Sequence, residues 1–271
     1  MHQKSKDIQL QYEGFLNTPF LWHGKGVFNF KPFKSSVIKT AIFSALITQK
    51  LRLGKLVERF VSFDLHQNST IKIIAENIQI QREKLTLGEL DCLLMQDKTP
   101  IHLEIVYKFY LYDSSVGNTE IEHFIGPNRK DSLVEKLTKL KEKQLPLLYS
   151  KECNAYLKEL KLASEKIEQQ IYFKAQLFVP FGKQNIQLNT LNQNCITGFY
   201  INQKELLKFN DCKFHIPTKH NWLVKPHTNI DWLNFKSFLP AVNQFLINKK
   251  SPLCWLKKPN GELFKIFVIW W

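Results

Sequence analysis

The chain has 271 residues, of which 44% are hydrophobic and 23% are charged. This length can bury a substantial core, and this composition excludes an intrinsically disordered or fibrous chain. The 38 Lys and Arg residues outnumber the 24 Asp and Glu residues, which gives a formal net charge of +14. Such an excess favours a polyanionic partner, nucleic acid before an anionic membrane, although a lysine-rich composition alone also produces basic proteins without such a partner.

The five cysteines are odd in number and include no C-x-x-C pair, which argues against a disulfide framework or a zinc knuckle. We therefore expect reduced, mostly buried thiols in an intracellular protein. Residues 1–7 lead into no apolar signal-peptide core, and no stretch approaches the roughly 18 apolar residues of a membrane-spanning helix. These features predict a soluble, cytoplasmic protein without a membrane partner.

The first third of the chain predicts a helix followed by a three-stranded meander. Residues 1–35 are rich in aromatic and turn-forming residues, which predicts an ordered segment that wraps onto the core. In residues 49–66, apolar side chains recur at steps of three and four, the pattern of an amphipathic helix. Three strand-like segments follow at 70–81, 85–96 and 101–112, with a turn at 97–100.

The chain then turns at residues 125–130 and enters two predicted helices, at 131–144 and 152–170. An apolar strand at 171–179 follows, and Pro180 and Gly182 end it. Helices and strands in this order indicate an α/β fold with a mixed sheet flanked by helices. We assign this core, with its N-terminal wrap, to residues 1–182.

From residue 183 the patterns weaken, and we predict an additional α+β region over 183–271 that packs on the core. Its expected elements are strands at 196–202 and 221–225, a helix at 231–247 and a hairpin that turns at 259–261. The apolar run 263–271 fits either a last core strand or an exposed interaction edge. We favour the core strand, because a single apolar strand at a terminus usually docks.

Two carboxylates and an amine stand out in the meander. Asp91 lies in the middle of the second predicted strand, and Glu104 and Lys108 share one side of the third with His102. The opposite side of the third strand is apolar and is predicted to be its buried face. Hard divalent cations such as Mg²⁺ or Mn²⁺ take oxygen ligands, so we predict that Asp91 and Glu104 hold the metal while Lys108 acts on the attacking water and the phosphate.

Glu58 is predicted to be a further metal ligand and catalytic residue. It interrupts the apolar stripe of the helix at 49–66, where a carboxylate that faces the core is costly without a partner. A metal ion or Lys108 could be that partner. The alternative is that Glu58 turns to the flank of the helix and meets solvent. Glu89, close by in the second strand, is expected to support the ligands and not to bind metal itself.

A second candidate site is the turn Asn128-Arg129-Lys130, which precedes a lysine-rich helix. The N-terminus of a helix is suited to phosphate, so we predict that these three residues contact nucleic acid. The lysines farther along this helix could equally form an ordinary solvated face.

Together these residues resemble the PD-(D/E)XK nuclease superfamily. The matching features are Glu58 on a helix, Gly88-Glu89-Leu90-Asp91 on one strand, and Glu104 with Lys108 on the next. The run 52–145 more closely resembles a bacterial family of domains of unknown function that is placed in this superfamily. The resemblance implies a restriction-endonuclease-like core and Mg²⁺-dependent cleavage of DNA or RNA.

In one respect the sequence departs from the superfamily pattern. The acid and the lysine are usually two residues apart, whereas Glu104 and Lys108 are four apart. Two further hypotheses therefore stand beside a nuclease. One is a non-catalytic nucleic-acid-binding protein on the same fold, and the other is a protein-interaction scaffold that uses its aromatic ends.

Overall fold

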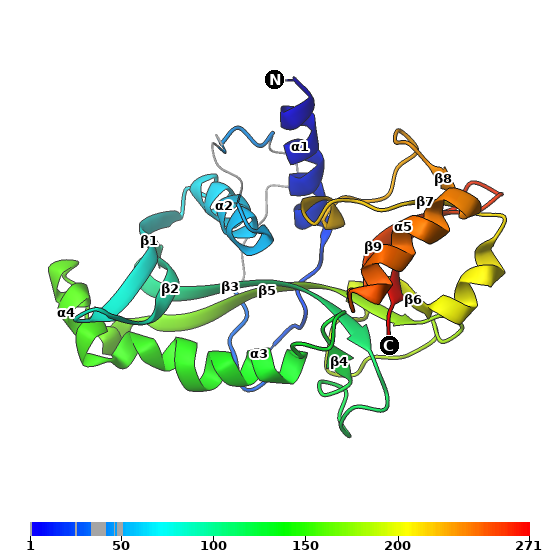
Figure 1. Cartoon of the computed structure of the whole chain (residues 1–271). Helices are drawn as coiled ribbons and strands as arrows, with labels where there is room; N and C mark the ends of the chain where they lie inside the picture. Colours follow the sequence, from blue (N-terminus) through cyan, green and yellow to red (C-terminus); the bar gives the residue numbers. More distant parts are fainter. Residues whose placement is uncertain (1, 25, 34–41, 46, 48–50) are drawn as a thin grey trace. The chain divides into compact units, whose positions relative to one another are not determined.

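The computed structural model in Figure 1 describes residues 2–24, 26–33, 42–45, 47 and 51–271. The chain divides into two compact units, each built from separate segments. Unit 1 comprises Met1–Pro19, Lys108–Val134 and Ala175–Trp271, and unit 2 comprises Phe20–Tyr107 and Glu135–Lys174. Among the described residues, none of the helices is long and apolar enough to cross a membrane.

Unit 2 contains the predicted helix and meander. Its elements are α2 (Leu53–His66), β1 (Ile71–Arg82), β2 (Leu85–Gln96), most of β3 (Thr99–Tyr112), most of α3 (Leu133–Lys139), the π-helix η1 (Leu140–Gln144), the 3₁₀ turns η2 (Leu145–Tyr149) and η3 (Ser164–Lys166), α4 (Lys151–Glu159) and the first half of β5 (Glu168–Pro180). The three predicted strands are confirmed to within two residues. The predicted helix at 49–66 is confirmed from residue 53, and its residues 49 and 50 lie outside the described part.

The meander forms because two tight turns reverse the chain between apolar strands. β1 pairs antiparallel with β2, and β2 pairs antiparallel with β3. Glu83 and Asp97 adopt φ angles of 53° in these turns, in the left-handed region. Left-handed residues at short hairpin turns match the right-handed twist of the strands that they connect.

Helices cover both faces of this meander (Figure 1). α2 lies on one face, and the run from α3 to α4 lies on the other. An apolar cluster that includes Ile78, Leu90, Leu148 and Leu157 fills the space between the strands and the second set of helices. With both faces covered, His102 and Glu104 are fully buried. The prediction that only the apolar side of the third strand is buried is therefore wrong.

Unit 1 contains the remaining elements. They are α1 (His2–Asn17), β4 (Phe124–Ile125), the second half of β5, η4 (Gln193–Cys195), β6 (Ile196–Asn202), η5 (Gln203–Phe209), β7 (Lys213–His215), η6 (His220–Trp222), β8 (Leu233–Asn234), α5 (Phe235–Ile247), β9 (Leu253–Lys257) and β10 (Leu263–Ile269).

Within the described residues, the strands hydrogen-bond into a ten-stranded sheet in the order β1-β2-β3-β5-β6-β10-β9-β7-β8, with β4 paired to β3. The sheet is mixed, because β6 is parallel to β5 and to β10, whereas β10 is antiparallel to β9. Helices flank it. The predicted α/β class with a mixed sheet is thus confirmed.

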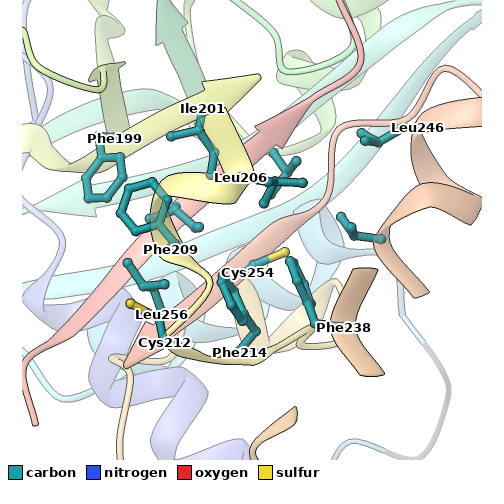
Figure 2. Packing of buried hydrophobic residues seen from close by; sticks show 13 residues of the cluster. Phe199, Ile201, Leu206, Phe209, Cys212, Phe214, Phe238, Leu246, Cys254 and Leu256 are labelled. Atoms are coloured by element: carbon teal, nitrogen blue, oxygen red, sulfur yellow. The ribbon is translucent and has the colours of Figure 1, made fainter. Parts of the chain in front are cut away.

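Aromatic side chains dominate the core of unit 1 (Figure 2). The cluster gathers residues from β6, η5, β7, α5, β9 and β10, among them Phe199, Phe209, Phe214 and Phe238. The Phe214 and Phe238 rings stack with centroids 4.0 Å apart and planes at 5°. This pair anchors α5 to β7, since each ring is fully buried.

Unit 1 also buries an amine. The Nζ atom of Lys265, on β10, donates hydrogen bonds to Gln176 Oε1 at 2.9 Å and to the backbone oxygens of Trp222 and Leu223 at 2.6 and 3.3 Å. Burial lowers the pKa of Lys265 to about 7. The three acceptors offset part of the cost of placing a cation in the protein interior.

Several predicted elements differ from the structure. The N-terminal wrap begins with a regular helix, α1, and of its later residues 25, 34 and 35 lie outside the described part. The helix predicted at 152–170 ends at Glu159. The strand predicted at 221–225 is wrong, because the 3₁₀ turn η6 ends at Trp222 and residues 223–225 form no strand. The last apolar run is confirmed as a core strand, β10, and all five cysteines are free and buried.

The boundary predicted at residue 182 stays a prediction. The last third of the chain belongs to unit 1, and most of residues 20–174 belong to unit 2. Unit 1 also includes residues 108–134 and the N-terminal segment, so the units do not divide at a single position. Strands β3 and β5 each contribute residues to both units.

Candidate active site

The candidate site in unit 2 lies where β2 and β3 stop pairing. Their ladder runs from Gln96 opposite Thr99 to Cys92 opposite Leu103. Beyond this pair, the Asp91 carboxylate replaces a backbone acceptor. Its Oδ2 atom accepts a hydrogen bond from the backbone N–H of Ile105 at 2.8 Å. A side chain thus occupies the place of a strand carbonyl, and this holds Asp91 at the end of the ladder.

Glu104 is held by hydrogen bonds on both carboxylate oxygens. His102 Nε2 lies 3.1 Å from Oε1, and Gln144 Nε2 donates to Oε2 at 2.6 Å. The side-chain amide of Gln169 lies 3.1 Å from His102 Nδ1 and donates to the Leu145 carbonyl at 2.7 Å. Because the Gln169 amide donates to Nδ1, a neutral His102 carries its proton on Nε2 and donates it to Glu104.

Lys136 continues this chain of hydrogen bonds. Its Nζ atom donates to Gln144 Oε1 at 2.6 Å. The amide of Gln144 therefore links the lysine amine to the Glu104 carboxylate. Because Gln144 lies in the π-helix η1 and π-helical turns are rare and concentrate at functional sites, this local geometry is itself informative.

Glu58 has a partner that the sequence prediction missed. Lys55, one turn earlier on α2, donates from Nζ to Glu58 Oε2 at 2.7 Å, to Asn77 Oδ1 at 2.7 Å and to Glu89 Oε1 at 2.5 Å. The amine thus joins α2 to β1 and β2. Lys55, and not Lys108, is the amine bonded to Glu58.

The carboxylates of the site repel one another. Burial, together with the charges of Glu104 and Glu58, raises the pKa of Asp91 to about 7. The Ile105 N–H and the charge of Lys136 act in the opposite direction. Mutual repulsion among buried carboxylates is the electrostatic condition that a bound cation relieves, and strongly perturbed pKa values concentrate at functional sites.

Glu58 shows the same effect. Burial raises its pKa, and the charge of Glu89 adds to this, whereas the hydrogen bond and charge of Lys55 oppose it. Across the described parts of the chain, no group of three His, Cys, Asp or Glu side chains is arranged to hold a metal ion. A hard cation requires only one or two carboxylates when water and phosphate oxygens supply the other ligands, so the chemistry of Asp91 and Glu104 fits Mg²⁺ or Mn²⁺.

Lys108 forms an ion pair within unit 1. Its Nζ atom donates to Asp131 Oδ2 at 2.6 Å. Its predicted catalytic role stays a prediction. The amines that the structure places with the carboxylates of unit 2 are Lys55 and Lys136. Lys55 was recognisable from its spacing of three residues before Glu58, whereas Lys136 was one of several lysines on its helix.

A comparison with protein-family models shows the family to which the chain belongs. The model of a family described as a domain of unknown function, DUF1853, matches residues 38–265. The chain belongs to the DUF1853 family. No curated protein and no solved structure matches the chain. The DUF1853 match spans all three carboxylates, both lysines of the site and the turn at 128–130.

The second predicted site of this DUF1853 chain, the turn at residues 128–130, makes contacts within unit 1. Asn128 Oδ1 accepts a hydrogen bond from the backbone N–H of Ser251 at 2.7 Å. The Arg129 guanidinium bonds Asp113 at 2.8 Å and lies 4.4 Å from the centre of the Trp271 ring. Lys130 is exposed. Arg129 is exposed as well, and contact of these three residues with nucleic acid stays a prediction.

Proposed function

We propose that the chain is a metal-dependent phosphodiesterase that acts on nucleic acid and has a restriction-endonuclease-like core of the PD-(D/E)XK type. The observation that carries this proposal is the placement of Asp91 and Glu104 on the paired strands β2 and β3, with the Asp91 carboxylate bonded to the Ile105 N–H and Glu104 fully buried. The charges of Glu104 and Glu58 contribute to the raised pKa of Asp91. Three elements, α2, β2 and β3, contribute one carboxylate each. The helix-meander-helix order of unit 2 agrees with the fold that the sequence resemblance implies.

In this proposal, Asp91 and Glu104 hold Mg²⁺ or Mn²⁺, and Glu58 assists. When bound, such an ion supplies the positive charge that activates water and offsets charge on the phosphate. His102 and Gln144 fix the orientation of Glu104 through one hydrogen bond to each oxygen. Orienting bonds of this kind typically affect metal affinity or activity about 10- to 100-fold.

The amines have distinct roles. Lys136 and Lys55 bring positive charge to the carboxylates, and Lys108 is assigned to the substrate phosphate. The net charge of +14 supports a DNA or RNA substrate, because a basic protein attracts the phosphate backbone. Five free, buried thiols support a reducing, cytoplasmic compartment as part of the proposal.

A non-catalytic nucleic-acid-binding protein on the same fold is the second candidate. Two observations favour it: hydrogen bonds already engage both oxygens of Glu104, and the Lys108 amine is paired with Asp131. The two functions differ in their response to divalent cations. Only the enzyme requires Asp91 and Glu104 to bind one.

The test compares wild type with Asp91→Asn and Glu104→Gln on single-stranded, duplex and structured DNA and RNA, with Mg²⁺ or Mn²⁺. We expect cleavage by wild type and a loss of about 100-fold or more in each variant, because each substitution removes a metal ligand. Glu159→Gln is the matched control, since this exposed glutamate lies in unit 2 on α4. It should cleave as wild type does.

Thermal unfolding provides a reading that does not depend on activity. Millimolar Mg²⁺ or Mn²⁺ should raise the melting temperature of wild type and of Glu159→Gln, but not of Asp91→Asn, because a ligand that binds the folded state stabilises it by mass action. Absence of cleavage together with metal-independent melting of wild type would contradict the enzyme. Retained nucleic-acid binding under those conditions would support the second candidate.

A further inference from the structure

Lys219, in unit 1, holds its amine against aromatic rings. The Nζ atom lies 3.2 Å from the centre of the Trp222 ring and 5.5 Å from that of Phe109. Within the described residues, this amine makes no hydrogen bond and no ion pair, whereas Lys219 as a whole is exposed. Both rings are buried, and the negative face of an aromatic ring attracts a cation placed over it.

Lys108 supplies a second amine in this region, since it directly precedes Phe109 on β3, whose ring centre lies 5.5 Å from Lys219 Nζ. Loss of solvent around the amine is the larger cause that lowers the pKa of Lys219 to about 8, and the positive charge of Lys108 lowers it further. Asp131 acts in the opposite direction. This local region therefore holds two cations and one carboxylate.

Asp131 is fixed in a tight turn and in turn fixes Lys108. The backbone N–H of Gly126 donates to the Asp131 carbonyl at 2.7 Å. A Cβ atom at Gly126 would lie 1.9 Å from Asp131 Oδ1, so a side chain at this position would displace the carboxylate. With the residues that the structure describes, the Lys108 amine makes one of its three possible hydrogen bonds, to Asp131. Two of its N–H groups remain for a ligand, and the Lys108 side chain is 35% exposed.

We propose that Lys219 and Lys108 together bind one phosphate group of a nucleic-acid backbone. A phosphate oxygen would give the Lys219 amine an acceptor, and its negative charge would relieve the repulsion between the two lysines. Asp131 holds Lys108 in position without neutralising both amines. The choice of nucleic acid as the source of the phosphate rests on the proposed function, whereas the anion site itself rests on the contacts within unit 1.

The test measures binding of a fluorescent oligonucleotide in EDTA, so that no cleavage occurs, across a series of salt concentrations. Lys219→Gln should weaken binding about three- to tenfold at low salt and lower the slope of log affinity against log salt by about 1, as expected for one lost phosphate contact. Lys204→Gln is the control. It removes the same charge from another exposed lysine of unit 1 and should change the slope less.

Two further variants separate a phosphate contact from a loss of folding or of unrelated packing. Lys219→Arg keeps the charge and should retain most of the affinity. Lys108→Gln, with circular dichroism to establish that it folds, should lower the slope as Lys219→Gln does. Equal affinities and slopes for wild type, Lys219→Gln and Lys204→Gln would overturn the proposal.

Inorganic phosphate distinguishes the two sources of the anion. At matched ionic strength, it should displace the oligonucleotide little more than chloride does if the nucleic-acid backbone is the ligand. Strong displacement by phosphate, with the affinity of Lys219→Gln for the oligonucleotide unchanged, would overturn the assignment to nucleic acid. Because the assay contains no metal, its outcome is independent of whether Asp91 supports cleavage.

Discussion

The two units bury charges of opposite sign and accommodate them in different ways. In unit 2, Glu104 is fully buried and receives donors from His102 and Gln144, with Asp91 close enough for the two charges to interact. In unit 1, Lys265 is buried among an amide and two carbonyl oxygens. The amine of unit 1 thus has its hydrogen-bond acceptors, whereas the acids of unit 2 repel one another. That difference locates the candidate cation site in unit 2.

Burial shifts the two groups toward neutrality from opposite directions. The pKa of Asp91 is raised to about 7, so the folded chain binds this proton more tightly than the unfolded chain. Its contribution to stability is therefore greatest in acid and declines as the pH rises toward 7. The pKa of Lys265 is lowered to about 7, so the unfolded chain binds that proton more tightly. Its contribution improves as the pH rises from about 7 toward 10.

The largest expected effect tests whether unit 1 depends on its aromatic core. Phe238→Ala should lower the free energy of unfolding by about 4 kcal/mol, because it removes a fully buried ring and leaves a cavity against Phe214. Urea denaturation followed by fluorescence measures this. Leu207→Ala, at a side chain that is 67% exposed, should change stability by less than about 0.5 kcal/mol. Similar losses in the two variants would contradict the assigned packing.

The next effect tests the repulsion in unit 2. In EDTA at pH 8, Asp91→Asn should raise the free energy of unfolding by about 2 kcal/mol, because it removes a buried charge and keeps an acceptor for the Ile105 N–H. The gain should fade as the pH falls to about 4, where the aspartate approaches protonation in both states. Glu159→Gln should show no such dependence. A destabilised Asp91→Asn at pH 8 would mean that the carboxylate is stabilising in the absence of metal.

The smallest effect tests the buried amine of unit 1. Lys265→Met should be less stable overall, because three acceptors lose their donor. The informative quantity is how the difference in free energy of unfolding between Lys265→Met and wild type changes with pH. Between pH 7 and 9, wild type should gain about 1 kcal/mol relative to Lys265→Met, since Lys265 loses its proton in the folded state first. A constant difference would show that burial does not shift this amine.

Local patterns were sufficient to predict much of unit 2. The strands of the meander alternate and are bounded by turn residues, and the apolar stripe of α2 recurs at helical spacing. Asp91, Glu104 and Glu58 could be selected because a carboxylate within an apolar element requires an explanation. In contrast, Gln144 and Gln169 reach the site from residues 40 and 67 positions beyond their partners. No local pattern specifies such pairs.

Unit 1 was harder to predict, because tertiary packing overrides weak local signals there. Helix α1 is mostly polar, yet it buries Tyr12 and Phe15. The backbone directly after η6 packs so closely on α1 that a Cβ atom at Gly14 would lie 2.1 Å from the Leu223 oxygen. The Trp222 side chain of this segment packs edge-to-face on Phe109 of β3 and Phe267 of β10, so it contacts the sheet although its own backbone is not a strand. The run Trp222-Leu223-Val224 is too short for its apolar character alone to distinguish a strand from a turn that packs on the sheet.

The position of β10 has a consequence for how the chain is assembled during synthesis. This strand comes last in the sequence, yet it lies between β6 and β9 and pairs with both. Until residues 263–269 emerge from the ribosome, β6 and β9 each lack the partner on one edge, and that edge presents unpaired backbone groups. Unit 2 needs no residue beyond Lys174. A nascent chain should therefore pass through a stage in which one unit is complete while the other still requires its central strand, and this is the stage at which a holdase chaperone would find exposed strand edges.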